Sequence, residues 1–359
     1  MRFLRWLLVI VVGLILIPPF WYALFPERAP ELPPPGTTAQ LASGNAVNVL
    51  DEGEGPVVVL VHGLPGSAYD WRELTPLLNE AGLRTIAYDR VGYGRSPPRA
   101  VGTFTLRSNG ADLDDLLDAM DLQDVTVVGW SYGGALAMQA ADDPRIARIV
   151  LVGTGGPSSD DFEPPERAPV IDFLYSMPVL RWRNAVPPVS RALQAALSDE
   201  AFSGGVKPDW WLDSLSANFQ RWDTVLTYRN EIFADFDPTA IEPRAIDTPT
   251  LIIHAEDDRL ASVQIGRYLA QTIPGAEYRE VPGASHMLPI THAPLLTQLI
   301  SQFVGPPPAA EPAPEPTEDA PAEAGVQAVA PMSSPVPMLA PTVETGTAAQ
   351  GDGGSEGPD

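Results

Sequence analysis

The residues best suited to chemistry lie in the run Gly129-Trp130-Ser131-Tyr132-Gly133. This run follows an apolar, β-branched stretch and precedes an alanine-rich one, so it joins a predicted strand to a predicted helix. A serine at the tip of such a turn forms a nucleophile elbow, in which Gly129 and Gly133 let the strand and the helix pass closely. The turn also places the Tyr132 amide at a helix start, where the peptide dipoles favour an oxyanion. We therefore expect Ser131 to be a nucleophile and the Tyr132 amide to be an oxyanion donor.

A second glycine-rich turn has the sequence His62-Gly63-Leu64-Pro65-Gly66 and follows an earlier apolar run. We expect the Leu64 amide to face the elbow as the second oxyanion donor, and one such donor contributes about 3 kcal/mol to transition-state stabilisation. Gly63 and Gly66 suit a tight turn. His62 is expected to hold the turn by hydrogen bonding instead of acting as a base. The Leu64–Pro65 bond is a candidate for a cis peptide.

A serine nucleophile needs a base within hydrogen-bond reach, and the chain has four histidines. His286 is the best candidate, because it lies in a loop after the predicted last strand, where catalytic groups gather. His254 ends a predicted strand and is expected beneath the site. His292 begins a predicted helix, with Pro294 near its first turn. The sequence thus favours His286 as the base.

An acid must orient the imidazole and stabilise its protonated form. The candidates lie in Glu256-Asp257-Asp258, directly after the predicted strand 250–254. Their residue types alone do not rank these three carboxylates. The chain has no cysteine, so it has neither disulfides nor thiolate metal ligands. A hydroxyl, an imidazole and a carboxylate need no metal ion or organic cofactor, and we expect none.

Short apolar, β-branched runs alternate with segments of helical period. The runs predicted as strands buried on both faces are 57–61, 84–88, 125–128, 149–152 and 250–253. Helical periodicity marks the segments 71–80 and 108–120. This alternation predicts a mostly parallel sheet, and residues 45–50 are predicted to add an antiparallel edge strand.

The alternation stops between about residues 155 and 247, where proline and aromatic residues become frequent. We interpret this segment as an inserted cap. Its aromatic side chains are expected to pack within the cap and to line an apolar pocket.

Both ends of the chain differ in composition from the body, which spans 41–304. Residues 1–25 contain an apolar stretch of about 20 positions after Arg2 and Arg5, long enough to cross a bilayer as a helix. Its bulky aromatic end favours an uncleaved single-pass anchor with the amino terminus in the cytoplasm. The proline-rich residues 26–40 are predicted to form a spacer. The catalytic domain is therefore expected outside the cytoplasm, in a bacterial periplasm or at the cell exterior.

The segment 305–359 consists mainly of proline, alanine and small polar residues with nine acidic residues, and we predict that it is disordered. The sequence assigns no partner to this tail. The net charge of the chain is −24, which argues against nucleic acid as a partner.

Five features together resemble the α/β-hydrolase fold family: the turn 62–66, the segment 88–96, the Ser131 elbow, the acidic loop and His286. The resemblance covers about residues 41–304. It implies an α/β fold with a mostly parallel, doubly wound sheet and an inserted helical cap. In similar sequences the acid is the fourth residue of a small-x-x-Asp turn, which selects Asp258, with Asp257 in reserve.

Several family groups share only part of the pattern. The His-Gly-x-Pro turn is similar to that of epoxide hydrolases and haloalkane dehalogenases, but those carry aspartate where this chain has Ser131. Proline iminopeptidases usually have Gly-Gly-Ser-Trp-Gly at the elbow, which differs from Trp130 and Tyr132.

We therefore predict a serine hydrolase that cleaves an ester of a small to medium apolar acyl group through an acyl-enzyme. Carbon–carbon bond hydrolysis, peracid formation as in cofactor-free haloperoxidases, and aminopeptidase activity are alternatives on the same residues. A non-catalytic binding module is the alternative from another class.

Overall fold

The computed structural model describes residues 35–99, 104–155, 187–233 and 241–305, which belong to one compact unit. The predicted anchor 1–25, most of the spacer, residues 306–359 of the tail and two parts of the cap (156–186 and 234–240) lie outside these residues. Within the described ranges, no helix is both long and apolar enough to span a bilayer.

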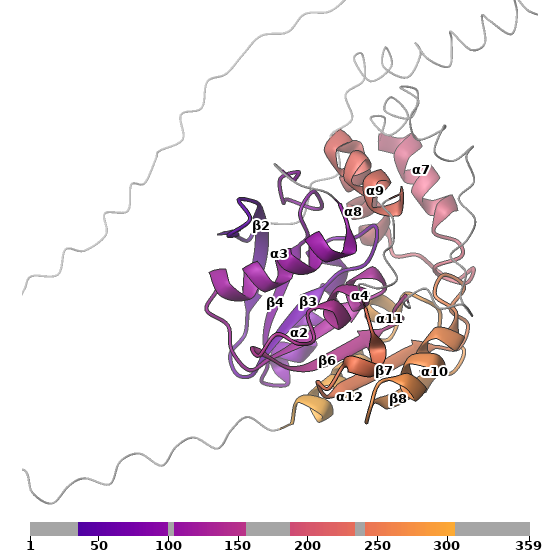
Figure 1. The fold of residues 1–359 in the computed structure, drawn as a ribbon. Coiled ribbons are helices and arrows are strands. Elements are labelled where there is room, and N and C mark those ends of the chain that lie inside the picture. Colours follow the sequence, from indigo (N-terminus) through magenta and orange to yellow (C-terminus); the bar gives the residue numbers. More distant parts are fainter. Residues whose placement is uncertain (1–34, 100–103, 156–186, 234–240, 306–359) are drawn as a thin grey trace, which may run out of the picture. The chain divides into compact units, whose positions relative to one another are not determined.

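An eight-stranded sheet forms the centre of the fold (Figure 1). Its strands are β1 (Thr37–Gln40), β2 (Ala46–Glu52), β3 (Val57–Val61), β4 (Arg84–Asp89), β5 (Val125–Trp130), β6 (Ile146–Val152), β7 (Thr250–Ala255) and β8 (Glu277–Val281). They lie in the order β1-β2-β4-β3-β5-β6-β7-β8. The pairs β1–β2 and β2–β4 are antiparallel, whereas all pairs from β4 through β8 are parallel. The prediction of a mostly parallel, doubly wound sheet with an inserted helical cap is confirmed.

Helices cover both faces of the sheet. They are α2 (Thr75–Glu80), α3 (Leu106–Ala119), α4 (Tyr132–Gln139), α10 (Val263–Thr272), α11 (Leu288–Thr291) and α12 (Ala293–Val304), with the short 3₁₀ helices η1 (Ala68–Trp71) and η3 (Pro243–Ala245). Along β3, Val58 and Leu60 pack into one core with α2 and α12, while Val59 and Val61 pack into the other with α3, α4 and α10. A strand with both faces buried reads as a continuous apolar run, which is why 57–61 was recognisable.

The prediction at the amino-terminal edge of the sheet is wrong in one respect. Residues 37–40, which we placed in the spacer, form β1, so the predicted edge strand is the second strand and β1 is the edge. Thr37 pairs with Val49 and Gln40 with Ala46. The side chains of β1 are mostly exposed and none is large and apolar, so backbone pairing holds the strand and the sequence carries no hydrophobic signal for it.

The cap contains α7 (Pro187–Leu197), α8 (Asp209–Gln220) and α9 (Trp222–Phe233), inserted between β6 and β7. These helices lie together at one end of the sheet (Figure 1). Hydrogen bonds fasten the cap to the loop that follows β4. The Arg221 guanidinium donates to the carbonyls of Gly94 and Ser96, and the Thr224 hydroxyl donates to the Gly92 carbonyl. The cap is thereby held over the carboxyl ends of the parallel strands.

Candidate active site

Ser131 occupies a strained turn between β5 and α4. Its backbone has φ 55° and ψ −119°, a conformation that an L-residue adopts only when the surrounding structure enforces it. The Ser131 amide donates to the Val152 carbonyl at 2.9 Å, which fixes the turn to the end of β6. This arrangement presents the serine side chain at the carboxyl edge of the sheet.

Glycine is required on both sides of Ser131 because the chain segments nearly touch. A Cβ atom on Gly129 would lie 2.3 Å from the Gly133 carbonyl oxygen. A Cβ atom on Gly133 would lie 2.1 Å from the Val61 carbonyl oxygen on the neighbouring strand. Neither neighbour is a flexible side chain, so any larger residue would displace the elbow.

The turn 62–66 lies directly against this elbow. A Cβ atom on Gly63 would be 3.0 Å from the Ser131 Cβ atom, and one on Gly66 would be 2.4 Å from an Asp70 carboxylate oxygen. The Leu64–Pro65 peptide bond is cis, as predicted. Within the described ranges, the amides of Leu64 and Tyr132 donate to no backbone carbonyl. Both amides therefore remain available to a bound group.

His62 holds this turn and is fully buried. Its Nδ1 lies 2.9 Å from the Gly63 carbonyl oxygen, and its Nε2 accepts the Arg90 amide at 3.0 Å. Burial, together with the positive charge of Arg90, lowers the pKa of His62 well below its ordinary value. The imidazole is consequently neutral, with its proton on Nδ1, and acts as a brace in the turn.

Asp258 and His286 form a buried pair. His286 Nδ1 lies 2.7 Å from Asp258 Oδ2, and the exposed fractions of the two residues are 4% and 8%. The other carboxylate oxygen, Oδ1, accepts the amides of Leu260 and Ala261 at 2.9 and 2.7 Å. Both oxygens are thus engaged, which fixes the carboxylate and leaves Nε2 as the free nitrogen of His286.

The other two carboxylates of the loop and the other two histidines make different contacts. Glu256 and Asp257 are exposed, and Glu256 accepts the Gly283 amide. His254 lies behind Asp258, 3.7 Å from its Oδ2, and its Nε2 is 2.7 Å from the Ala261 carbonyl oxygen. His292 occupies the N-cap position of α12 without a side-chain cap bond, and its Nδ1 lies 2.8 Å from the Thr291 hydroxyl. Of the described histidines other than His286, none lines the pocket at Ser131.

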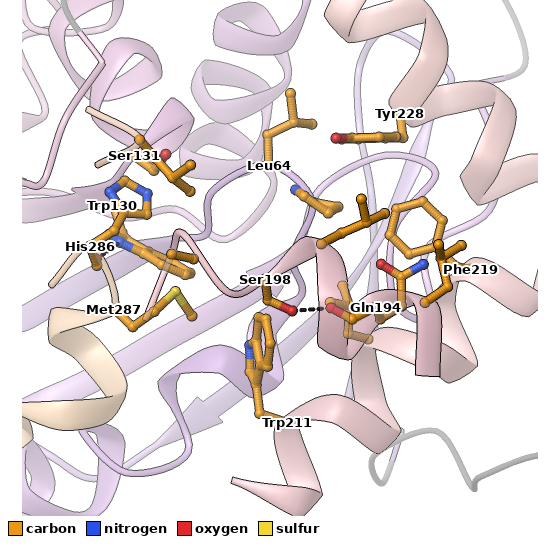
Figure 2. A pocket seen from close by; sticks show the side chains of 16 residues that line it. Leu64, Trp130, Ser131, Gln194, Ser198, Trp211, Phe219, Tyr228, His286 and Met287 are labelled. Carbon is orange, nitrogen blue, oxygen red and sulfur yellow. Dashed lines mark hydrogen bonds between the residues drawn. The ribbon is translucent and has the colours of Figure 1, made fainter. Parts of the chain in front are cut away.

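Ser131 and His286 line the same pocket, which has a volume of about 200 Å³ (Figure 2). Its walls are mainly apolar side chains from the cap and from the turn 62–66. Trp211, Phe219 and Tyr228 contribute aromatic surface, and Phe219 and Tyr228 also pack edge to face at 5.2 Å. The aromatic residues of the cap therefore pack against one another and also line the pocket, as expected from the sequence. No cluster of ligating side chains that could hold a metal ion occurs in the part of the chain that the structure describes.

A buried ionic cluster that was not predicted from the sequence lies beside the turn 62–66. Arg90, the residue directly after β4, pairs with Glu231 on α9 through two bonds of 2.8 and 3.2 Å. Glu231 also accepts from the Tyr93 hydroxyl and the Asn109 amide, both at 2.7 Å. Arg90 lies in the quoted segment 88–96, but its partner is 141 residues away, so sequence spacing gives no signal for the pair.

This cluster contacts the groups that flank both candidate oxyanion donors. Arg90 donates to the Gly63 carbonyl at 3.2 Å, and its guanidinium lies 4.7 Å from the centre of the Tyr132 ring. Burial raises the pKa of Tyr132 to about 12, so its hydroxyl stays protonated at neutral pH. Through Arg90, the cap residue Glu231 is thereby linked to the turn 62–66 and to Tyr132, which carry the two candidate oxyanion donors.

Comparisons with known proteins extend over most of this fold. A family model described as alpha/beta hydrolase fold matches residues 56–293. A 2-hydroxy-6-oxononadienedioate/2-hydroxy-6-oxononatrienedioate hydrolase of Paraburkholderia xenovorans is 29% identical over 71% of this chain and 89% of that protein. A non-heme haloperoxidase of Rhodococcus erythropolis is 28% identical over 73% and 97% of the two chains. A solved bromoperoxidase from Bacillus anthracis has a TM-score of 0.62 at 25% identity, over 75% of this chain and 99% of that one.

Proposed function

The chain belongs to the α/β-hydrolase fold family, and from this premise we propose that it cleaves a bond next to a carbonyl carbon through an acyl-enzyme on Ser131. Its relatives are enzymes, several of them named as hydrolases, and the non-catalytic alternative has no support from them. The observation that carries the proposal is that His286, held by the buried Asp258, lines the same pocket as a serine on a strained elbow.

The proposed mechanism follows from which nitrogen of His286 is free. Nδ1 faces Asp258, so Nε2 takes the proton from the Ser131 hydroxyl as it attacks the carbonyl carbon. The Leu64 and Tyr132 amides would hold the oxyanion of the tetrahedral intermediate. His286 then returns the proton to the leaving group, and a water molecule activated by the same imidazole releases the acyl group.

The relatives favour a carbon–carbon bond over an ester as the bond that breaks. The name of the Paraburkholderia xenovorans relative describes the hydrolysis of a hydroxy-keto dicarboxylate, and such a compound has no ester to cleave. Hydrolysis at its ketone consumes one water and gives a carboxylic acid and a fragment with a new C–H bond. The leaving carbon carries the electron pair, so the substrate class needs a second carbonyl that stabilises this carbanion as an enolate. His286 would deliver the proton to that carbon.

Ester hydrolysis is the second candidate, and the pocket supports it. Among the described lining residues, none has a charged side chain apart from His286 when it is protonated. An uncharged acyl group of small to medium size fits such walls. Peracid formation is supported by the likeness to the Rhodococcus erythropolis haloperoxidase and the Bacillus anthracis bromoperoxidase. Aminopeptidase activity lacks support, because no described carboxylate lines the pocket to receive a substrate ammonium group.

One set of assays on the purified full chain distinguishes these reactions. We expect turnover of a diketone whose leaving carbanion is enolate-stabilised, and loss of that turnover in Ser131→Ala. Turnover confined to uncharged aryl esters would show that the enzyme is an esterase and not a carbon–carbon bond hydrolase. Turnover confined to acetate with hydrogen peroxide would contradict both of these activities and support peracid formation.

The cellular location of the protein is inferred from the sequence alone. We propose that residues 1–25 anchor the chain in a membrane by a single span and that the hydrolase domain lies outside the cytoplasm, in a periplasm or at the cell exterior. The support is the apolar stretch after Arg2 and Arg5.

A further inference from the structure

Gln194 is a polar side chain set into an apolar part of the pocket. It lies on α7 of the cap, its exposed fraction is 5%, and it lines the same pocket as Ser131. Figure 2 places Ser131 and His286 on one side of this pocket and Gln194 on the other, beside Phe219. The glutamine is therefore remote from the reacting atoms but open to the same space.

The side-chain amide of Gln194 has no hydrogen-bond partner among the described residues. The Gln194 backbone carbonyl accepts both the Ser198 amide, at 3.0 Å, and the Ser198 hydroxyl, and neither bond involves the side-chain amide. The neighbours of Gln194 in the wall include Leu193, Leu197 and Leu215. The Ser198 hydroxyl, just beyond the end of α7, is engaged with the backbone and is not a partner of the Gln194 side-chain amide.

Gln194 is 5% exposed and open to the pocket, so its amide loses most of its contact with water and gains no hydrogen bond from the described fold in exchange. Leucine or methionine would fit these walls and stabilise the cap, since neither carries a polar group. A glutamine at this position is consistent with a partner that arrives with the ligand, because the pocket is large enough to hold a small molecule.

We propose that Gln194 binds an uncharged oxygen of the substrate, a carbonyl or a hydroxyl, at the end remote from the bond that Ser131 attacks. This inference rests on the proposed function and adds a substrate class to it. An uncharged oxygen is favoured over a carboxylate because no Lys or Arg lies among the described residues of the lining. The substrate is then a mainly apolar molecule with two oxygen-bearing groups, one at each end of the pocket.

The test uses fluorophosphonate probes, which phosphonylate an activated serine whichever bond the natural substrate breaks. One probe carries a saturated alkyl chain, and the matched probes carry a ketone in place of a single methylene at each position in turn. The rate of Ser131 modification in the full chain is measured by intact-protein mass spectrometry. We expect one ketone position to react about tenfold faster than the alkyl probe, the gain typical of one buried hydrogen bond.

Two substitutions remove the preference in different ways. Gln194→Met has a similar volume and no polar group, and Gln194→Glu keeps an acceptor but loses the donor. Both are expected to react with the best ketone probe at the rate of the alkyl probe, while the alkyl rate stays within about twofold of the wild type. Ser198→Ala is the matched control. It removes the hydroxyl of another polar residue in this wall and should keep the preference for the ketone probe over the alkyl probe.

The two proposals fail in different ways. Equal rates for alkyl and ketone probes in the wild-type chain, or a ketone preference that survives in both Gln194 variants, would overturn the role of Gln194 and leave the serine chemistry intact. Absence of labelling at Ser131 by every probe in folded protein would overturn the proposed function itself.

Discussion

The hydrogen bond from His286 to Asp258 is the residue-scale feature that distinguishes three adjacent carboxylates. Asp258 is buried, whereas Glu256 and Asp257 face solvent. Only a carboxylate that stays on the imidazole can fix its tautomer and stabilise the imidazolium. The carboxylate in contact with His286 is therefore Asp258, the one that the family resemblance indicated and that residue types alone left open, and its role as the acid stays a prediction.

A matched pair of substitutions tests this assignment. Asp258→Asn should lower kcat by about 10³- to 10⁴-fold, because the amide imposes the wrong tautomer on His286. Asp257→Asn removes the same charge one residue earlier and should change kcat by less than about twofold. Steady-state kinetics on the best substrate measures both, and circular dichroism checks the fold. A comparable loss in Asp257→Asn would contradict the assignment.

The residues that sequence predicted and those that it missed differ in the range of their signals. Ser131 and His286 lie in short motifs next to strand ends, so a local pattern identified them. Arg90 lies in such a motif as well, but its partner Glu231 comes from another part of the chain, and only folding brings them together. Gln194 carries no motif at all, and its position in the pocket depends on how the cap packs.

At the scale of elements, the pair Arg90–Glu231 joins α9 of the cap to the end of β4. Both side chains are almost fully buried, and Arg90 also lies 4.7 Å from the centre of the Tyr93 ring. A buried pair of this kind adds little stability relative to apolar residues, but removal of one partner leaves an uncompensated charge. Substitution of either Arg90 or Glu231 is therefore expected to weaken the packing of the cap on the loop after β4.

Glu231→Ala should lower the free energy of unfolding by about 3–5 kcal/mol, because it leaves Arg90 buried without its counter-ion. The control is Glu200→Ala, which removes the acid of a pair with Arg259 in which both side chains are more than half exposed. That change should stay within about 1 kcal/mol of the wild type. Urea unfolding of the full chain measures both, and equal effects would contradict the structural role of the cluster.

Asp70 gives the contact between η1 and α8 a dependence on pH. Its carboxylate accepts the Ser67 amide at 3.0 Å and the Trp211 indole at 3.1 Å. Burial raises the pKa of Asp70 to about 7, and the nearby Asp89 adds to the rise. The folded state therefore holds a proton that the unfolded chain, with a pKa near 3.8, has already lost.

Stability from this group is present below about pH 4 and is lost as pH rises towards 7. Asp70→Asn has no proton to lose, so the wild type should lose stability relative to the variant as pH rises from about 4 to 7. Thermal unfolding at several pH values gives the difference between the two proteins. A difference that stays constant or changes in the opposite direction would contradict the raised pKa.

At the scale of the whole molecule, the alternation of apolar runs and helical segments was enough to predict a mostly parallel central sheet, and the family resemblance implied the helical layers on both of its faces. Strands β3 to β7 are buried on both faces, so each of them is visible in the sequence as a run of apolar residues. Strand β1 and the helices of the cap could not be predicted in detail. Strand β1 is held by backbone pairing, and the cap helices depend on contacts with the loop after β4.

Membrane attachment is a prediction about the whole chain. The full-length protein should sediment with membranes and be released by detergent but not by high salt. The double change Leu14→Arg and Leu16→Arg should release it, because each arginine near the centre of a span costs about 2.5–3.5 kcal/mol. Hydrolase activity per molecule should be unchanged. A wild-type chain that stays in the supernatant would contradict the anchor.

The central claim is that Ser131 becomes acylated because His286 removes its proton. The most direct measurement is intact-protein mass spectrometry with peptide mapping after brief reaction with a fluorophosphonate. The account predicts one adduct per chain, located on Ser131, which is absent in Ser131→Ala and at least about 10²-fold slower in His286→Ala, with both variants folded. An adduct on another residue, or labelling of Ser131 that is unaffected by loss of His286, would contradict it.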